Sequence, residues 1–356
     1  MSELPDAPRI LVILMGALGD VVRGLSIVDR IKLHRPAARI TWLVEPACKG
    51  IVSLHTGVDR IIVFNRKRWL SGFFGICKEL RAERYDITLD LQRHSKSGLF
   101  SFLSGAPRRV GFHRRDSKEG NWIFNTEYVA EQGDTLPKIE HYHLFLDAIG
   151  VAPGPISVTP LSAITLSTLS DDIQRDLPGP YVGLVLGSSW QSKDWPEEGY
   201  EKLIALLLAS KAAPTPLRVA LLGDGSKKEM GERLVAAHGN DPRVINFAGR
   251  TDLRSLVGLL RSAKVIVGPD SGPGHISGAV GTPHVTLFGP TPVGRNAPRG
   301  SEALTMVSSV GCAPCRKRVC PGLGGVCMRL LSASSVAERV EGVLLGSEGG
   351  KPLFPR

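Results

Sequence analysis

The first residue that could do chemistry is a carboxylate, Asp20, placed just after a turn that contains two glycines. Gly16 and Gly19 lie between an apolar run and a helix pattern. Glycines let the backbone turn tightly, and the start of a helix offers free N–H groups and the positive end of the helix dipole. A carboxylate there could act as a general base toward a ligand hydroxyl. The alternative is an ordinary acid that stabilises the first helical turn.

A dinucleotide-binding site is a weaker interpretation of the same turn. The fingerprint of that fold needs three glycines and an acid after the second strand. Glu45 supplies the acid, but the third glycine is missing. The sequence therefore gives NAD binding little support.

Two loops in the second half carry residues suited to phosphate. Three serines precede Lys193, whose ammonium group is a point charge that suits a phosphate. Further on, a glycine-rich segment opens a helix whose free N–H groups could bind a diphosphate without a metal. A polar loop with a solvated lysine and a plain turn are the alternatives. The residues concerned are Ser188, Ser189 and Ser192, then Asp270, Ser271, Gly272, Gly274 and His275, with Thr291 near the same rim.

Four cysteines lie within sixteen residues, at Cys312, Cys315, Cys320 and Cys327. Four thiolates could form a tetrahedral structural zinc site, although the spacing differs from that of common zinc ribbons. The alternative is a set of buried or loop thiols without a metal. Six cysteines in 356 residues do not make a disulfide scaffold.

Basic residues gather in the first half of a chain whose formal net charge is +10. Clusters at residues 66–68, 108–109 and 114–115 lie near Trp69 and several phenylalanines. Such a surface could bind an anionic headgroup at a bilayer. For any single cluster, a solvated face is the alternative.

Strand and helix patterns alternate in both halves of the chain. This alternation predicts an α/β fold with two Rossmann-like domains built on parallel sheets. Ligands of such sheets bind beyond the carboxyl ends of the strands, where Asp20, Lys193 and Asp270 are expected. Short apolar runs predict strands at 9–15, 39–44, 60–64, 86–91, 109–112, 181–186, 217–222, 244–247, 264–267 and 284–288. Helices are expected at 47–56, 73–83, 138–149, 170–177, 196–209, 227–237, 253–262, 274–280 and 336–345.

A stretch rich in proline and glycine separates the two series of elements. We expect a domain at 1–160, a linker at 161–180, a domain at 181–335 that includes the cysteine cluster, and a helix and tail at 336–356. The N-terminus carries acids where a signal peptide needs Lys or Arg, so export is not expected. No run of about 18 apolar residues predicts a transmembrane helix.

Several segments, taken together, resemble glycosyltransferase family 9, the bacterial ADP-heptose:lipopolysaccharide heptosyltransferases. They are Ile10–Arg23 (ILVILMGALGDVVR), Trp42–Val63, Tyr85–Gly98, Lys193–Pro196 and Asp270–Pro290 (DSGPGHISGAVGTPHVTLFGP). The resemblance implies a GT-B fold, two Rossmann-like domains with the active site between them. It also implies transfer of heptose from ADP-heptose to the lipid A core with inversion at the anomeric centre. The N-terminal domain would then bind the acceptor and the C-terminal domain the nucleotide sugar.

The resemblance also implies roles for individual residues. Asp20 matches the general base and Lys193 the lysine on the donor phosphates. Glu229 is the candidate for the ribose contact. The donor set comprises Gly19, Ser188, Ser189, Ser192, Glu229, Asp270, Ser271, Gly272, Gly274, His275 and Thr291. The expected acceptor set is Arg23, Arg66, Arg68, Gln92, Lys96, Arg114 and Arg115.

The expected reaction needs no cofactor, because no DxD-type metal motif follows the strands; the one metal considered is a structural zinc at the cysteines. Expected partners are ADP-heptose or a related nucleotide sugar, the lipid A-core acceptor and the inner-membrane surface, with no nucleic acid. The protein is expected in the cytoplasm, peripheral to the inner membrane. A nucleotide-sugar epimerase, a transferase that uses another nucleotide sugar, and a non-catalytic binding module are the alternatives.

Overall fold

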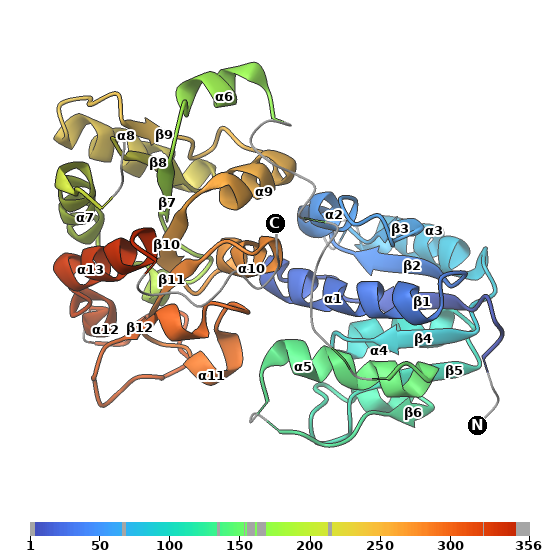
Figure 1. Ribbon diagram of the computed structural model, residues 1–356. Helices are drawn as coiled ribbons and strands as arrows, with labels where there is room; N and C mark the ends of the chain where they lie inside the picture. Colours follow the sequence, from blue (N-terminus) through green and yellow to red (C-terminus); the bar gives the residue numbers. More distant parts are fainter. Residues whose placement is uncertain are drawn as a thin grey trace. The chain divides into compact units, whose positions relative to one another are not determined.

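The computed structural model describes residues 4–65, 69–133, 136–152, 154, 161, 169–212, 216–322 and 324–346, with the backbone alone for 69–72 (Figure 1). Two compact units divide the chain, unit 1 at Met1–Pro160 and unit 2 at Leu161–Arg356. Each is described by itself below.

Unit 1 is a six-stranded parallel sheet with helices on both faces. Its strand order is β3-β2-β1-β4-β5-β6. Helix α1 packs against α2 and α5, and α3 packs against α4. The strands are β1 (Arg9–Ile13), β2 (Arg39–Val44), β3 (Arg60–Val63), β4 (Ile87–Asp90), β5 (Arg108–Gly111) and β6 (Glu127–Tyr128). The helices are α1 (Leu18–His34), α2 (Pro46–Val52), α3 (Trp69–Arg81), α4 (Ser95–Leu103) and α5 (Lys138–His143), with 3₁₀ segments η2 (Asn121–Phe124) and η3 (Leu144–Ile149).

Unit 2 repeats this architecture, with strand order β12-β11-β10-β7-β8-β9. Helices α7, α8 and α13 pack together, as do α9 and α10. The strands are β7 (Tyr181–Val185), β8 (Arg218–Leu222), β9 (Val244–Asn246), β10 (Val265–Pro269), β11 (His284–Phe288) and β12 (Thr305–Val307). The helices are α6 (Asp171–Asp176), α7 (Glu197–Ala209), α8 (Lys228–Ala237), α9 (Leu253–Ser262), α10 (Gly272–Val280), α11 (Val293–Asn296), α12 (Val326–Arg329) and α13 (Ala333–Leu344), with 3₁₀ segments η6 (Gln191–Lys193), η7 (Gly225–Lys227) and η8 (Glu302–Leu304).

Helix α1 lies close to the sheet of unit 1 at Gly24. A Cβ atom on Gly24 would lie 2.5 Å from Cδ2 of Leu14 and 3.3 Å from the Trp42 ring, so a larger residue would require the Leu14 side chain to shift. Trp42 is fully buried and donates its indole N–H to the carbonyl of Leu14 over 3.1 Å. The hydrogen bond joins β2 to the residue after β1, and the helix that carries Asp20 packs on these two residues through Gly24.

All ten predicted strands are present, and the α/β class with two Rossmann-like units is confirmed. The prediction missed β6 and β12, edge strands of two and three residues, because a run that short shows no periodicity. It also missed α4, whose sequence contains three serines and a glycine, and the four-residue helices α11 and α12. The helix expected at 138–149 is α5 followed by the 3₁₀ segment η3.

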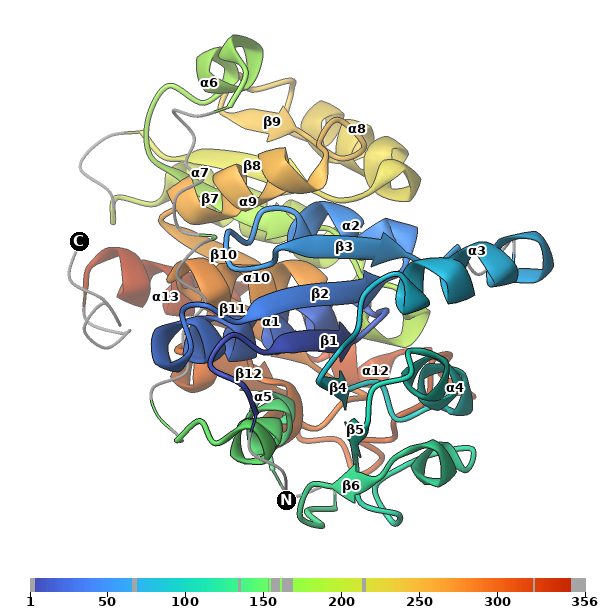
Figure 2. The same cartoon turned by 90° about the vertical axis from the view of Figure 1, so that its right-hand side faces the viewer.

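The parallel strands of unit 1 bring the loops that follow them to one edge of the sheet. In Figure 2 the arrows of β2 and β3 point the same way, and α3 and α4 lie toward that edge. Within the described residues, no helix has the length and apolar character needed to cross a bilayer.

A buried carboxyl group, Asp90, ties the end of β4 to its neighbours. Asp90 accepts hydrogen bonds from Ser97 Oγ (3.0 Å) on α4, from Asn121 Nδ2 (2.6 Å) on η2 and from the backbone N–H of Gln92 (3.1 Å). Burial raises the pKa of Asp90 to about 6 and outweighs these hydrogen bonds, which lower it. Asp90 therefore favours the folded state most strongly when it is protonated.

This carboxyl group gives a prediction for stability against pH. The folded pKa of about 6 lies above the ordinary value of 3.8, so the stabilisation is complete below about pH 4 and is lost as the pH rises through about 6. Asp90→Asn does not titrate. We expect the unfolding free energy of the wild type, relative to Asp90→Asn, to fall by about 2 kcal/mol between pH 4 and pH 7. Urea denaturation across this range measures it, and a difference that does not change with pH would contradict it.

Candidate active site

Asp20 lies in the first turn of α1, directly beyond the carboxyl end of β1. Its Oδ1 atom accepts from Arg23 Nη2 (2.5 Å) and from Lys138 Nζ (3.1 Å) on α5. Burial by itself would raise the pKa of Asp20, but the charges and hydrogen bonds of Arg23 and Lys138 outweigh it and hold that pKa well below its usual range. Tyr142, also on α5, lies against Asp20, and burial together with this carboxylate raises the pKa of its hydroxyl. We call Asp20, Arg23, Lys138 and Tyr142 the Asp20 cluster.

The turn before Asp20 is held in place by Gln92. Its Oε1 atom accepts from the backbone N–H groups of Met15 (2.7 Å) and Gly16 (3.3 Å), and its Nε2 atom donates to the carbonyl of Gly16 (3.1 Å). Three of the four hydrogen-bonding positions of the amide are thus used on this turn. Gln92, expected to bind the acceptor, is in this structure a support for the loop that carries Asp20.

The other expected acceptor residues have varied surroundings. Lys96 lies with Nζ 5.1 Å from the centre of the Phe64 ring, and the Arg114 guanidinium lies 4.9 Å from the centre of the Trp122 ring. Arg115 is exposed and pairs with Glu131 at 3.2 Å. Arg23 is buried and pairs with Asp20. The remaining two, Arg66 and Arg68, lie outside the described residues.

Arg93 also lies at this edge and was not among the predicted site residues. It follows β4 with φ of 72°, a backbone conformation that a non-glycine residue adopts only at a cost. Its guanidinium lies 4.0 Å from the centre of the Phe112 ring and contacts His141 Nδ1. Lys138 and Tyr142 were also missed, because their approach to Asp20 depends on the packing of α5 against α1.

A second cluster lies in unit 2, at the carboxyl ends of β7, β10 and β11. Asp270 is buried and accepts through Oδ2 from Lys193 Nζ (2.8 Å) and Thr291 Oγ1 (2.8 Å). His275 Nε2 lies 3.7 Å from Oδ1. Burial would raise the pKa of Asp270, but the contacts of His275 and Lys193 outweigh it and hold that pKa well below its usual range. We call Lys193, Asp270, His275 and Thr291 the Asp270 cluster.

Helix α10 opens beside this cluster and offers groups that suit an anion. It starts at Gly272, directly after Ser271, so the free N–H groups of its first turn follow the Asp270 position. Ser271 Oγ is buried without a hydrogen-bond partner. A Cβ atom on Gly274 would lie 3.2 Å from the ring of His284, which explains the glycine inside this helix. A lysine, a hydroxyl and a helix start together can bind a phosphate group.

The three serines before Lys193 differ in their surroundings. Ser192 is buried and donates to the carbonyl of Lys317 over 2.6 Å. The hydroxyl of Ser188 donates to the carbonyl of Trp190 over 3.0 Å. Ser189 is exposed. The hydroxyls of Ser188 and Ser192, expected to bind the donor, thus shape the loop in this structure.

Comparison with known families settles which family this is. Residues 74–324 match the model of glycosyltransferase family 9 (heptosyltransferase). The chain belongs to this family. It is therefore a glycosyltransferase.

Curated relatives of this family 9 chain are lipopolysaccharide heptosyltransferases. The core heptosyltransferase OpsX of Haemophilus influenzae is 27% identical over 296 residues, which cover 81% of each chain. The lipopolysaccharide heptosyltransferase 1 of Pseudomonas aeruginosa is 26% identical over 324 residues, which cover 88% of this chain and 87% of the relative.

Solved structures of similar fold confirm the GT-B class of the two sheets. The Escherichia coli heptosyltransferase WaaC, solved with ADP, has a TM-score of 0.75 at 23% identity, covering 94% of this chain and 99% of WaaC. The family 9 glycosyltransferase from Veillonella parvula has a TM-score of 0.79 at 20% identity, covering 97% and 99%.

The loop after β8 contacts the Lys193 loop through a lysine that was not predicted. Lys227 Nζ pairs with Asp194 Oδ2 at 2.7 Å, and Asp194 Oδ1 accepts from the N–H of Ser188 at 2.8 Å. Glu229, the candidate for the ribose contact, is exposed in the first turn of α8 and interacts electrostatically with Arg233. Lys227 is therefore the residue of this segment that supports the Lys193 loop.

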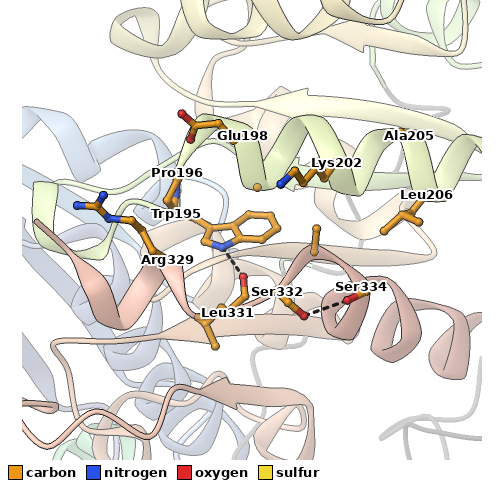
Figure 3. Close-up of a pocket in the computed structure, with 12 residues that line it drawn as sticks. Trp195, Pro196, Glu198, Lys202, Ala205, Leu206, Arg329, Leu331, Ser332 and Ser334 are labelled. Carbon is orange, nitrogen blue, oxygen red and sulfur yellow. Dashed lines mark hydrogen bonds between the residues drawn. The ribbon is translucent and has the colours of Figure 1, made fainter.

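Unit 2 also has a groove of about 720 Å³ between α7 and the start of α13 (Figure 3). Trp195 contributes to its lining and donates its indole N–H to the carbonyl of Leu331 over 3.0 Å. Among the described residues that line it, none belongs to the Asp270 cluster. The groove is thus separate from the candidate donor site.

None of the four clustered cysteines forms a disulfide within the described residues. Cys327 is buried, Cys312 is exposed, and Cys315 and Cys320 are half-buried. Burial and the three neighbouring thiols raise the pKa of Cys327. Over the described part of the chain, no three His, Cys, Asp or Glu side chains are grouped so that they could bind a metal ion. The structural zinc at these cysteines stays a prediction.

The contacts of Gln92 give a second prediction. Gln92→Leu removes the partners of two N–H groups and one carbonyl in the turn before Asp20. We expect about 3 kcal/mol of destabilisation and faster amide hydrogen exchange at Met15 and Gly16. Gln191→Leu, at an exposed glutamine, is the control and should change neither. Unchanged exchange in Gln92→Leu would refute the support role.

Proposed function

We propose that this chain transfers heptose from ADP-heptose to a sugar hydroxyl of the lipid A core, with inversion at the anomeric carbon. Its curated relatives are named lipopolysaccharide heptosyltransferases, and a structure of similar fold was solved with ADP. The observation that carries the proposal is the Lys193–Asp270 pair beside the start of α10, in a chain of family 9.

Lys193, the first N–H groups of α10 and Ser271 bind the donor diphosphate. Negative charge builds on the diphosphate as its bond to the anomeric carbon breaks, and these groups stabilise that charge. A cation and preorganised N–H donors do this work here, so the reaction needs no divalent metal. Asp270 holds Lys193 in position at 2.8 Å and is itself oriented by Thr291 and His275.

Asp20 is the general base. A sugar hydroxyl is a poor nucleophile, and Asp20 takes its proton while the oxygen attacks the anomeric carbon opposite the departing ADP. The bond from the anomeric carbon to the acceptor oxygen forms, the bond to the diphosphate oxygen breaks, and the proton ends on the Asp20 carboxylate. A single displacement of this kind inverts the anomeric centre.

The acceptor is a phosphorylated lipid, and the protein works at the cytoplasmic face of the inner membrane. The net charge of +10 and the basic clusters in the first half of the chain support this proposal. They favour an anionic surface through long-range electrostatics.

Removal of the base tests the reaction. Asp20→Asn keeps the shape of the side chain but cannot accept the proton, so we expect turnover to fall by about 10²–10⁴-fold with little change in ADP affinity. Mass spectrometry of products from a nucleotide-sugar panel and truncated core acceptors measures turnover, and calorimetry measures ADP binding. Unchanged turnover would refute the role of Asp20. An isomerised nucleotide sugar without a new glycosidic bond would indicate an epimerase.

Removal of the donor-side charge is a separate test. Lys193→Met should lower kcat/KM by about 10²-fold, because one donor to the leaving group is worth about 3 kcal/mol, and should weaken ADP binding. Lys202→Met, at an exposed lysine on α7, is the matched control and should leave both unchanged. Wild-type ADP affinity in Lys193→Met would exclude Lys193 from the diphosphate site.

A further inference from the structure

The carboxylate of Asp20 is paired with two cations that differ in how they are held. Arg23 is three residues further along the same helix, and its side chain is only 9% exposed. Lys138 comes from α5, and its side chain is 31% exposed. Both donate to the same oxygen, Oδ1. Arg23 is therefore a fixed partner, whereas solvent and ligands can reach Lys138.

Pairing with two cations makes a carboxylate a weak base. Each neighbouring positive charge favours the ionised form, so a proton taken from a hydroxyl binds less well. The strength of a general base follows its pKa, and Asp20 in this state is far from the range that proton transfer from an alcohol favours. Asp20 becomes a stronger base when one of its two cations leaves, and Lys138 is the partner that solvent reaches.

The other groups that face Asp20 do not replace this step. Tyr142 on α5 and Cys48 on α2 are both buried, and burial raises the pKa of each, that of Cys48 to about 11. The negative charge of Glu45 disfavours the Cys48 thiolate and raises the pKa of Cys48 further. Arg93, which acts on Tyr142 through its charge, is held by Phe112 and His141. Lys138 is thus the more exposed of the two cations paired with Asp20.

We propose that Lys138 binds an anionic group of the acceptor, and that its transfer from Asp20 to that group frees Asp20 to accept the proton of the reacting hydroxyl. This inference rests on the proposed function and assigns the acceptor chemistry: a carboxylate or phosphate near the hydroxyl that is glycosylated. Exchange of one ion pair for another costs little, whereas a neutral acceptor offers Lys138 no partner and leaves Asp20 paired. Lys138 then determines acceptor specificity.

The test compares acceptors with and without the anionic group. Wild type, Lys138→Met and Lys138→Arg are assayed with a truncated lipid A-core acceptor, with the same acceptor after methyl esterification of its carboxylates, and with it after removal of its phosphates. We expect Lys138→Met to lower kcat/KM for the intact acceptor by about 10–100-fold, and to be no worse than wild type on the acceptor that lacks the recognised group. Lys138→Arg should recover part of the loss, because it keeps the charge but changes partners less readily than lysine. If wild type and Lys138→Met have the same kcat/KM on the esterified acceptor, the recognised group is a carboxylate. If they have the same kcat/KM on the dephosphorylated acceptor, it is a phosphate.

A second lysine of unit 1 provides the control for this test. Lys32→Met removes another lysine of unit 1 that pairs with an aspartate, Asp59, at 2.9 Å, and should behave as wild type. Equal losses on all three acceptors in Lys138→Met, or no loss on the intact one, would overturn the inference.

The affinities of the three acceptors, measured by calorimetry, do not require turnover. If no acceptor is glycosylated by wild type, the proposed function fails, and the inference is judged on these affinities alone. Loss of the preference for the intact acceptor in Lys138→Met supports anion recognition, and an unchanged preference rejects it.

Discussion

Two carboxylates, a half-buried Asp20 and a buried Asp270, each kept ionised by paired cations, are the constraint on which both candidate sites depend. Burial raises the pKa of a carboxyl group whose hydrogen-bond donors are neutral, as Asp90 shows. Asp20 and Asp270 instead have cations within 3.1 Å, and their pKa values lie well below the usual range. The packing of α5 on α1 brings Lys138 to Asp20, and the loop after β7 brings Lys193 to Asp270, in each case at the carboxyl end of a parallel strand.

The backbone beneath Asp20 is arranged to hold one carboxylate in one place. Gly24 lets α1 approach Leu14 and Trp42, and a hydrogen bond joins these two residues. Gln92 fixes the preceding turn from the neighbouring strand end, and its own N–H is bound by Asp90. A carboxylate supported from two strands keeps its position when its partners change, which an exchange of ion pairs at Asp20 requires.

The sequence predicts the strands and the positions that follow them, because buried parallel strands are apolar runs and their ends are read directly from the chain. It therefore locates Asp20, Lys193 and Asp270. It does not predict Lys138, which is 118 residues from Asp20 in the chain, or the pairing of Lys227 with Asp194, because both depend on how neighbouring elements pack. It also assigns ligand contacts to Gln92 and Ser192, since a polar side chain in a loop looks the same whether it faces a ligand or its own backbone.

The two clusters use their lysines differently, although each lysine neutralises an aspartate. Asp270 binds Lys193 through both its side chain and its carbonyl oxygen, and only 13% of the lysine side chain is exposed. Such a lysine is a fixed charge, suited to a leaving group whose negative charge appears at a set place. Lys138 pairs with Asp20 at 3.1 Å and has more than twice that exposure. An ammonium group on a flexible stem changes partners more readily than a planar guanidinium does, and this difference explains why the partner of Asp20 that is reachable from solvent is a lysine while its buried partner is Arg23.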